Sequence, residues 1–102
     1  MEDVEYEFSA EKNATLKEQR GISFEEIIYY ISNGHLLDTI QHHNKEKYGS
    51  QKFYVVDVDG YVYLVPFVRQ NNNTIFLKTI FPSRKHTKQY LEKLKSGGKH
   101  HG

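Results

Sequence analysis

The stretch KFYVVDVDGYVYLVPFVR, residues 52–69, decides the fold predicted for this chain. Apolar and aromatic residues run along both sides of Asp59-Gly60, and this dipeptide is a preferred loop of two-residue β-hairpins. Such a loop places Val58 opposite Tyr61 and fixes every later pair of the two strands. The sequence therefore predicts a long antiparallel hairpin, and the other elements are assigned around it.

Two helices are predicted before this hairpin. Ser9 is a helix N-cap for Ala10–Arg20, and Gly21 ends that helix. Ser23 and Glu26 have the spacing of a capping box, which starts a second helix. Both helices are interpreted as structural.

Further strands are predicted at residues 5–9, 36–42 and 74–81. Pro66 has no backbone N–H and is expected to face an edge or a bulge. Ser83 is the N-cap of a last helix, whose apolar stripe is Thr87, Tyr90, Leu91 and Leu94. The pattern predicts an α+β fold: an antiparallel sheet, two N-terminal helices on one face, and a basic C-terminal helix. We assign residues 1–96 to a single domain and expect residues 97–102 to be a disordered tail.

The predicted register divides the sheet side chains between two faces. If residues 70–73 form the second loop, Arg69 lies opposite Thr74. One face is the expected core beneath the helices and holds Phe53, Val55, Val62, Leu64, Val68, Ile75, Leu77 and Phe81. The other mixes cations with aromatic rings and holds Lys52, Tyr54, Tyr61, Tyr63, Phe67, Arg69, Phe76 and Lys78.

Composition narrows the class of protein. The 102 residues contain no cysteine, which excludes disulfides and thiolate chemistry. No apolar run is long enough to span a bilayer, and the acidic opening MEDVEYEF is not a signal peptide, so a cytoplasmic protein is expected.

The charges divide between the two halves of the chain. Residues 1–60 carry 12 acidic and 6 basic side chains, whereas residues 61–102 carry 1 acidic and 8 basic side chains. Either the basic half meets an anionic partner, or the two halves neutralise each other.

The mixed face has the ingredients of a single-stranded RNA site. Cations follow the phosphates and aromatic rings stack on bases. The alternative is that another helix or a partner protein covers these rings.

The segment after Pro82 is basic. Arg84, Lys85 and Lys88 at the start of the last helix form either a solvated face or a phosphate site. RNA cleavage through the 2′-hydroxyl needs a proton acceptor and cations near phosphorus, and His86 and Tyr90 can move protons. The alternative interpretation of His86 is a surface residue, which is the commoner role of a single histidine on a helix.

A metal site is not predicted. His42 and His43 lie near Glu46, but adjacent residues of a strand point in opposite directions and do not share an ion. No cofactor is expected. The sequence also has no glycine-rich phosphate loop, no nucleophile elbow and no carboxylate pair.

Three stretches carry a resemblance to a known family: YEFSAEKNATLKEQRGISFEE, QKFYVV and IFPSRKHT. Together they resemble the BrnT family, ribonuclease toxins of bacterial type II toxin–antitoxin pairs with a RelE-like fold. The matching positions are Lys12, Gly21, Ser23, Phe24, Glu25, Glu26, Arg84 and Thr87. Lys52 lies near the Arg of the family's Glu-x-Arg strand entry. The departures from the family pattern are Leu16, Arg20, His86 and Tyr90, which stand where the family has Asn, His, a small residue and Glu.

The resemblance implies a metal-independent endoribonuclease that cleaves mRNA by attack of the 2′-hydroxyl. Arg84, which matches the family Arg, would stabilise the phosphorane with help from Lys52. His86 or Tyr90, which depart from the family pattern, would transfer protons because of their own chemistry, and Thr87 is placed in the same site. RNA would be held by Arg69, Lys78, Tyr54, Tyr63, Lys85 and Lys88.

The resemblance also implies a partner, a cognate antitoxin that is a small DNA-binding protein. The expected assemblies are a homodimer or a two-plus-two complex with the antitoxin, with no membrane association. The alternative hypothesis is a non-catalytic module that uses the basic, aromatic face to bind a protein or a nucleic acid. The residues Arg20 and Tyr90, which replace reactive groups of the family, favour this alternative.

Overall fold

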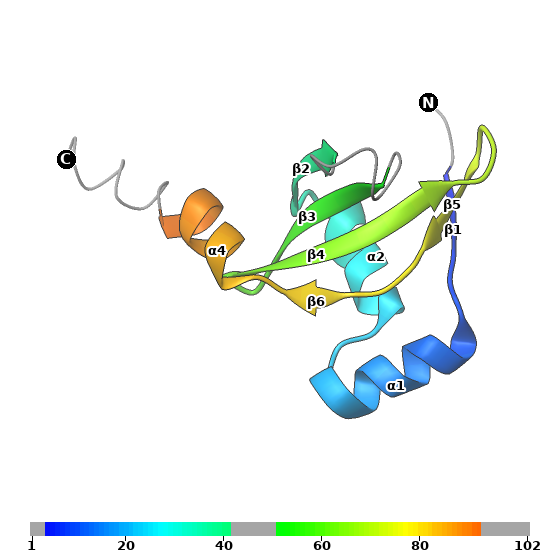
Figure 1. The fold of residues 1–102 in the computed structure, drawn as a ribbon, viewed down its shortest axis with the longest axis horizontal. Helices are drawn as coiled ribbons and strands as arrows, with labels where there is room; N and C mark the ends of the chain where they lie inside the picture. Colours follow the sequence, from blue (N-terminus) through cyan, green and yellow to red (C-terminus); the bar gives the residue numbers. More distant parts are fainter. Residues whose placement is uncertain (1–3, 42–50, 93–102) are drawn as a thin grey trace.

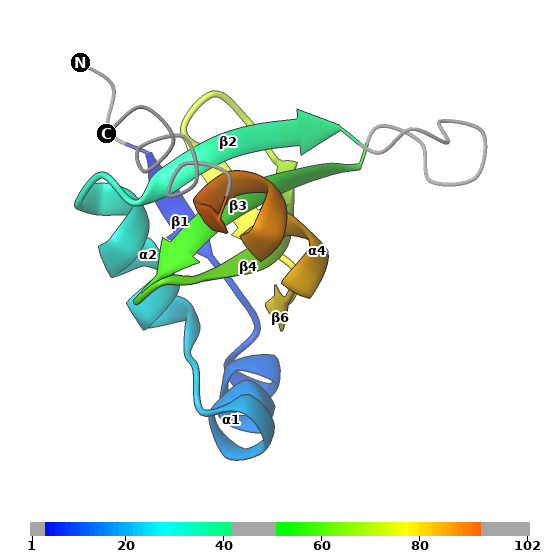
Figure 2. The same ribbon diagram turned by 90° about the vertical axis from the view of Figure 1, so that its left-hand side faces the viewer.

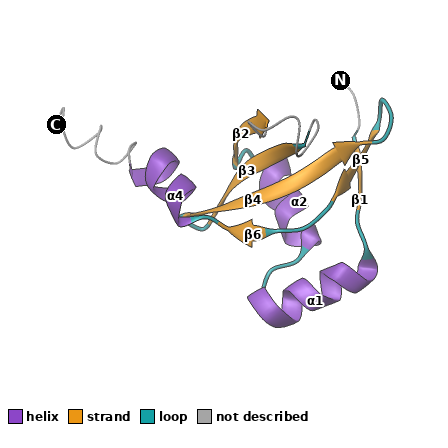
Figure 3. Ribbon diagram, in the orientation of Figure 1, coloured by secondary structure: helices purple, strands orange, loops and turns teal. Residues whose placement is uncertain are grey.

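The computed structural model describes residues 4–41 and 51–92 and confirms the α+β class (Figures 1 and 3). Its elements in chain order are β1 (Glu5–Glu7), α1 (Ala10–Arg20), α2 (Phe24–Ser32), β2 (Leu36–Gln41), β3 (Lys52–Val58), β4 (Tyr61–Arg69), β5 (Thr74–Leu77), β6 (Phe81–Pro82), α4 (Arg84–Thr87) and a π-helical turn η1 (Lys88–Glu92). The strand order is β1-β5-β4-β3-β2, and β6 pairs with β4. The sheet is mixed, because β1 runs parallel to β5 while the other pairs are antiparallel.

The predicted helix starts are confirmed. The Ser9 side chain accepts a hydrogen bond from the N–H of Lys12, and Gly21 ends α1 in the left-handed region at φ 68°. Ser23 and Glu26 form both bonds of the capping box that begins α2. These bonds join residues close in the sequence, so the local pattern was sufficient to predict them.

The first hairpin has the predicted register. Val58 pairs with Tyr61, and the pairing continues along both strands. Asp59 and Gly60 have φ values of 57° and 91°, as the tight loop requires. The Asp57 carboxylate accepts a 2.9 Å bond from the Gly60 N–H and braces the turn.

The predicted register of the second hairpin was wrong by one residue. Arg69 pairs with Ile75 rather than with Thr74. The Gln70 N–H donates to the Thr74 carbonyl at 2.8 Å, so the loop is one residue shorter than expected. Inside it, the Asn73 N–H donates to the side chain of Asn71. An asparagine side chain that accepts a hydrogen bond from the backbone of its own turn stabilises the shorter loop.

The one-residue shift changes which side chains share a face. Ile75 and Leu77 belong with Tyr54 and Phe67, whereas Phe76 lies opposite Val68. The prediction that placed Ile75 and Leu77 with Val55, and Phe76 with Tyr54, is therefore wrong.

The N-terminal helices cover the opposite face from the one predicted. Their buried residues Leu16, Phe24 and Ile27 pack in one cluster with Tyr54, Val56, Val65, Phe67, Ile75, Leu77 and Ile80. We call this side of the sheet the helix-covered face. Both faces of the hairpin are apolar, so alternation alone did not indicate which one the helices bury.

The other face is covered by α4 and η1, which together we call the C-terminal helical segment (Figure 2). Tyr90 and Leu91 of η1 pack on Val55, Val62 and Leu64. The Ser83 side chain caps α4 by accepting from the His86 N–H, as predicted. We call this side the C-terminal face.

The last predicted strand is divided into β5 and β6. Pro66 lies between the part of β4 that pairs with β5 and the part that pairs with β6. Without an N–H, Pro66 cannot continue the ladder, and its carbonyl accepts from Lys78 N–H instead. Arg20 supports the break, because its Nη1 donates to the Ile80 carbonyl at 3.0 Å.

Several predictions fall outside the described residues. They concern the His42, His43 and Glu46 group, the last position of the apolar stripe, Leu94, and the tail at residues 97–102.

Candidate functional site

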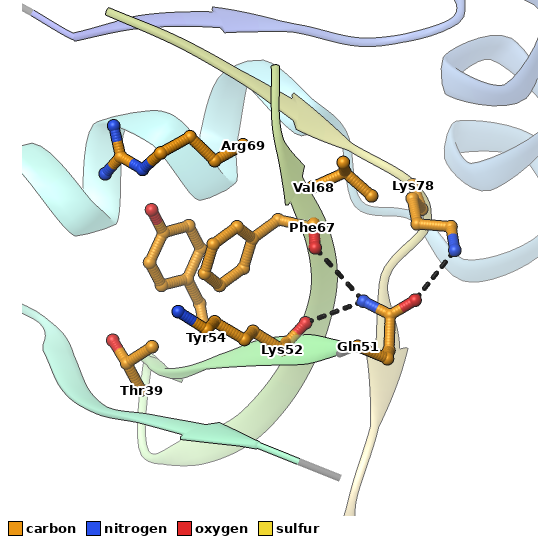
Figure 4. A pocket seen from close by; sticks show the side chains of 8 residues that line it. All are labelled: Thr39, Gln51, Lys52, Tyr54, Phe67, Val68, Arg69 and Lys78. Atoms are coloured by element: carbon orange, nitrogen blue, oxygen red, sulfur yellow. Dashed lines mark hydrogen bonds between the residues drawn. The ribbon is translucent and has the colours of Figure 1, made fainter. Parts of the chain in front are cut away.

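The first candidate site is a pocket of about 570 Å³ at the Lys52 end of β3 (Figure 4). Three cationic side chains contribute, Lys52 from β3, Arg69 from β4 and Lys78 from the segment after β5. We call it the cationic pocket, and its lining is Thr39, Gln51, Lys52, Tyr54, Phe67, Val68, Arg69 and Lys78. Among the described residues, no carboxylate lines it.

Two stacked rings form the floor of the cationic pocket. The rings of Tyr54 and Phe67 are 4.0 Å apart between centroids and nearly parallel. Each residue is only 7% exposed, so this stack belongs to the core. Burial raises the pKa of Tyr54 well above its usual range, the neighbouring Tyr6 adds to this rise, and Arg69 opposes it. The Tyr54 phenol therefore remains a hydrogen-bond donor at neutral pH.

Gln51 fixes the wall of the cationic pocket. Its Nε2 donates to the carbonyls of Lys52 at 2.9 Å and Phe67 at 3.1 Å, and so links β3 to β4. Its Oε1 accepts from the Lys78 ammonium at 2.7 Å (Figure 4). Sequence reasoning missed Gln51, because a glutamine that bridges two backbone carbonyls has no distinctive spacing.

The second candidate site lies on the C-terminal face, between the sheet and α4. It has a volume of about 480 Å³ and is lined by Ile40, Gln41, Phe53, Leu64, Phe81, Lys85, His86, Gln89 and Tyr90. We call it the imidazole pocket. The rings of Phe53 and Phe81 lie parallel in its wall, 6.4 Å apart between centroids.

His86 is held by its own helix cap. Its Nδ1 lies 2.7 Å from Ser83 Oγ, and its ring lies parallel to that of Tyr90 at 6.2 Å. Burial, and then the positive charge of Lys85, lower the pKa of His86 below its usual value. The imidazole is therefore neutral at neutral pH and can accept a proton.

Tyr90 links the helical segment to the edge strand. Its hydroxyl donates to Asp38 Oδ2 of β2 at 2.8 Å. Burial, and then the bond and charge of Asp38, raise the pKa of Tyr90. Tyr90 stays protonated, with its proton directed at Asp38.

Other predicted site residues lie apart from these groups. Thr87 is only 8% exposed and bonds inside the protein, accepting from the Val62 N–H and donating to the Ser83 carbonyl. Tyr63 is half-buried against the core of the helix-covered face, with its ring edge-on to Tyr61. Arg84 and Lys88 are exposed positions of the C-terminal helical segment that line neither pocket.

The predicted cations do not converge on one phosphate. Lys52 and Tyr54 point to the helix-covered face, whereas Phe53 between them lines the imidazole pocket. The structure thus brings Lys52, Arg69, Lys78 and Tyr54 together, and separately brings Lys85, His86 and Tyr90 together. The sequence reasoning assigned the faces of the sheet wrongly, and it therefore did not predict this division.

No protein-family model matches this chain, and no curated protein matches it. Within residues 4–41 and 51–92, no helix has both the length and the apolar character needed to cross a membrane.

Proposed function

We propose that this protein is a metal-independent endoribonuclease whose catalytic site is the imidazole pocket. The observation that supports the proposal best is the neutral imidazole of His86, held by Ser83 and placed beside Lys85 and aromatic rings. A neutral imidazole is the group that a 2′-hydroxyl attack requires as its base.

The chemistry follows from these contacts. In the tautomer whose Nδ1–H donates to Ser83 Oγ, Nε2 has a free lone pair. Nε2 takes the proton of the 2′-hydroxyl, the 2′-oxygen bonds to phosphorus, and the bond to the 5′-oxygen breaks. Water in the open pocket protonates the leaving oxygen, and the products end in a 2′,3′-cyclic phosphate and a 5′-hydroxyl. The Lys85 ammonium stabilises the charge that develops on the phosphoryl oxygens.

The test uses an unstructured RNA in EDTA. The wild-type chain is expected to cut it, and His86→Gln is expected to lower the rate by about a hundredfold or more. His35→Gln is the matched control, since His35 packs edge-on to Tyr30 and lines neither pocket. A 2′-O-methyl group at the cut site should abolish cleavage. Undiminished cleavage by folded His86→Gln would refute the assignment.

Arg84 is tested in the same assay. It precedes Lys85 on the first turn of α4, and the family resemblance assigns to it the charge on phosphorus. If it reaches the substrate, Arg84→Ala keeps the fold and loses cleavage. If cleavage is unchanged, Lys85 alone supplies the positive charge.

We further propose that the enzyme is the cytoplasmic toxin of a type II toxin–antitoxin pair, as the resemblance implies. Its partner would be a small DNA-binding antitoxin that binds over the cationic and aromatic surface. Expression alone should arrest growth, and coexpression of the adjacent gene should restore it. Growth that is unaffected by an active, folded enzyme would reject the toxin assignment.

A specific observation favours a second function, a non-catalytic binding module. The cationic pocket holds three positive side chains but no group in its described lining that serves as a base at neutral pH. RNA binding that weakens steeply with salt, without cleavage by any preparation, would favour this module.

A further inference from the structure

The cationic pocket carries a positive charge that the described residues of its lining do not neutralise. Lys52, Arg69 and Lys78 contribute three positive charges, and no described lining residue is acidic. The other polar side chains that line the pocket are neutral, namely Thr39, Gln51 and Tyr54. A concave site of one charge sign concentrates ions of the opposite sign.

The donors of the pocket are arranged around one opening. Figure 4 shows the Arg69 guanidinium, the Tyr54 hydroxyl, the Lys52 ammonium and the Thr39 hydroxyl bordering the same space. Arg69 donates through Nη1 to the Asn72 carbonyl at 3.1 Å, which steadies the guanidinium and leaves its other N–H groups available. Lys78 lines the pocket from the other side of Phe67, and its ammonium is bonded to Gln51.

The strands that carry these donors are held rigidly. The Gln51 amide joins the backbone at Lys52 to the backbone at Phe67, and the rings of Tyr54 and Phe67 stack directly below. These contacts fix the strand backbones from which Lys52 and Arg69 extend. A fixed scaffold lowers the cost of placing several donors around a compact, multiply charged anion.

We infer that the cationic pocket is a phosphate-binding site, separate from the imidazole pocket, that prefers a phosphomonoester to a phosphodiester. A monoester carries about 1.5 to 2 negative charges at neutral pH and three terminal oxygens, whereas a backbone diester carries one charge. The attraction to the same cations grows with the charge of the ligand. The Arg69 guanidinium, the Lys52 ammonium and the Thr39 hydroxyl can together contact all three terminal oxygens.

The monoester has two sources, the 5′-terminal phosphate of an RNA or free inorganic phosphate. The RNA source rests on the proposed function, but the phosphate site itself does not. If the ligand is the 5′-terminal phosphate of an RNA, the cationic pocket would hold that end of the strand while the imidazole pocket acts on another part of it. The enzyme would then prefer RNA with a 5′-phosphate.

The experiment measures binding without cleavage. Fully 2′-O-methylated trinucleotides with a 5′-phosphate or a 5′-hydroxyl are titrated into the full chain by calorimetry, alongside inorganic phosphate. The 5′-phosphorylated trinucleotide is expected to bind about tenfold tighter than the 5′-hydroxyl form, and Arg69→Gln or Lys52→Gln should each remove that difference. Both side chains are exposed, so these variants are expected to fold. Inorganic phosphate that binds as tightly as the trinucleotide, and with the same dependence on Arg69, would support the site and identify free phosphate as its ligand.

Three controls make the result specific. Lys12→Gln removes one positive charge from an exposed position on α1 and should leave the preference intact. Lys78→Gln should have a smaller effect than Lys52→Gln, because the Lys78 ammonium is already bonded to Gln51. His86→Gln should retain the full preference, which distinguishes failure of this inference from failure of the proposed nuclease. Equal affinity for the two trinucleotides with no binding of inorganic phosphate, or a preference that persists in Arg69→Gln, would overturn the inference.

Discussion

The hydroxyl of Thr87 accepts a 2.8 Å hydrogen bond from the backbone N–H of Val62, which lies 25 positions earlier in the chain. The same hydroxyl donates to the Ser83 carbonyl at 2.8 Å. One side chain therefore fixes the start of α4 to the middle strand of the sheet. This attachment sets the position of His86, one residue before Thr87, in the imidazole pocket.

The first prediction concerns this attachment. Thr87→Val keeps the shape of the side chain but leaves the buried Val62 N–H without an acceptor. The free energy of unfolding in urea should fall by about 1–3 kcal/mol. Thr15→Val is the control, because the Thr15 hydroxyl donates to the Glu11 carbonyl within α1 through an exposed bond, and its effect should stay within about 0.5 kcal/mol. Equal losses of unfolding free energy in the two variants would show that the bond to Val62 adds no more stability than the exposed bond of Thr15.

The second prediction concerns Asn13, which is only 6% exposed and joins α1 to α2. Its Oδ1 accepts from the Phe24 N–H at 2.8 Å, and its Nδ2 donates to Glu25 Oε1 at 2.8 Å. Asn13→Ala should lower the free energy of unfolding by about 1–3 kcal/mol, because the buried Phe24 N–H loses its acceptor.

The same variant should change the titration of Glu25. The bond from Asn13 is the main reason that the pKa of the Glu25 carboxyl lies below its usual value. This contribution to stability is present above the unfolded pKa and is lost as the pH falls through the folded pKa. In an NMR titration, the pKa of Glu25 should rise in Asn13→Ala. An unchanged pKa would mean that the bond is not formed in solution.

The third prediction is a pH dependence that comes from His86. Burial, followed by Lys85, lowers the pKa of the folded imidazole below the usual value of about 6.5. Between the folded and the unfolded pKa the unfolded chain binds more protons, so stability falls as the pH decreases through this window. As the pH falls through this window, the unfolding free energy of the wild type should therefore decrease relative to that of His86→Gln.

The nuclease rate should follow the same group. If Nε2 is the base, the acidic limb of the rate–pH profile should have its inflection below the usual histidine pKa. Lys85→Gln removes the second cause of the lowered pKa, so this inflection should move toward higher pH. An inflection that does not respond to Lys85→Gln would assign the limb to another group.

The fourth prediction concerns Tyr90 and Asp38, which lie 52 positions apart in the sequence. Tyr90→Phe keeps the ring against His86 but removes the bond to Asp38. Because this bond is exposed, the loss should be at the lower end of about 0.5–1.5 kcal/mol. A double-mutant cycle with Asp38→Ala should give a measurable coupling energy, and hydrogen exchange in α4 should become faster in Tyr90→Phe. Strictly additive effects would contradict the link.

The candidate site was only partly predictable. The sequence indicated that Lys52, Tyr54 and Arg69 share a face, because the hairpin register follows from Asp59-Gly60 alone. It did not indicate that Lys85 and His86 lie on the opposite face, since that depends on where α4 packs. Gln51 and Asp38 gave no signal, because their roles come from partners distant in the sequence.

The sequence by itself determined the features that depend on neighbours along the chain. The caps at Ser9, Ser23 and Ser83 each use a bond between residues three positions apart, and the first hairpin depends on its two-residue loop. These bonds form within a single turn of backbone, so the residue types on the two sides of the turn specify them.

Only the tertiary structure decided the second register and the face that each helix covers. Val55 and Val56 are both fully buried on opposite faces, so the alternation of side chains favours neither face for the helices. The choice is made by the total apolar surface that α1, α2 and the C-terminal segment remove from water together. That balance separates the basic side chains into two pockets.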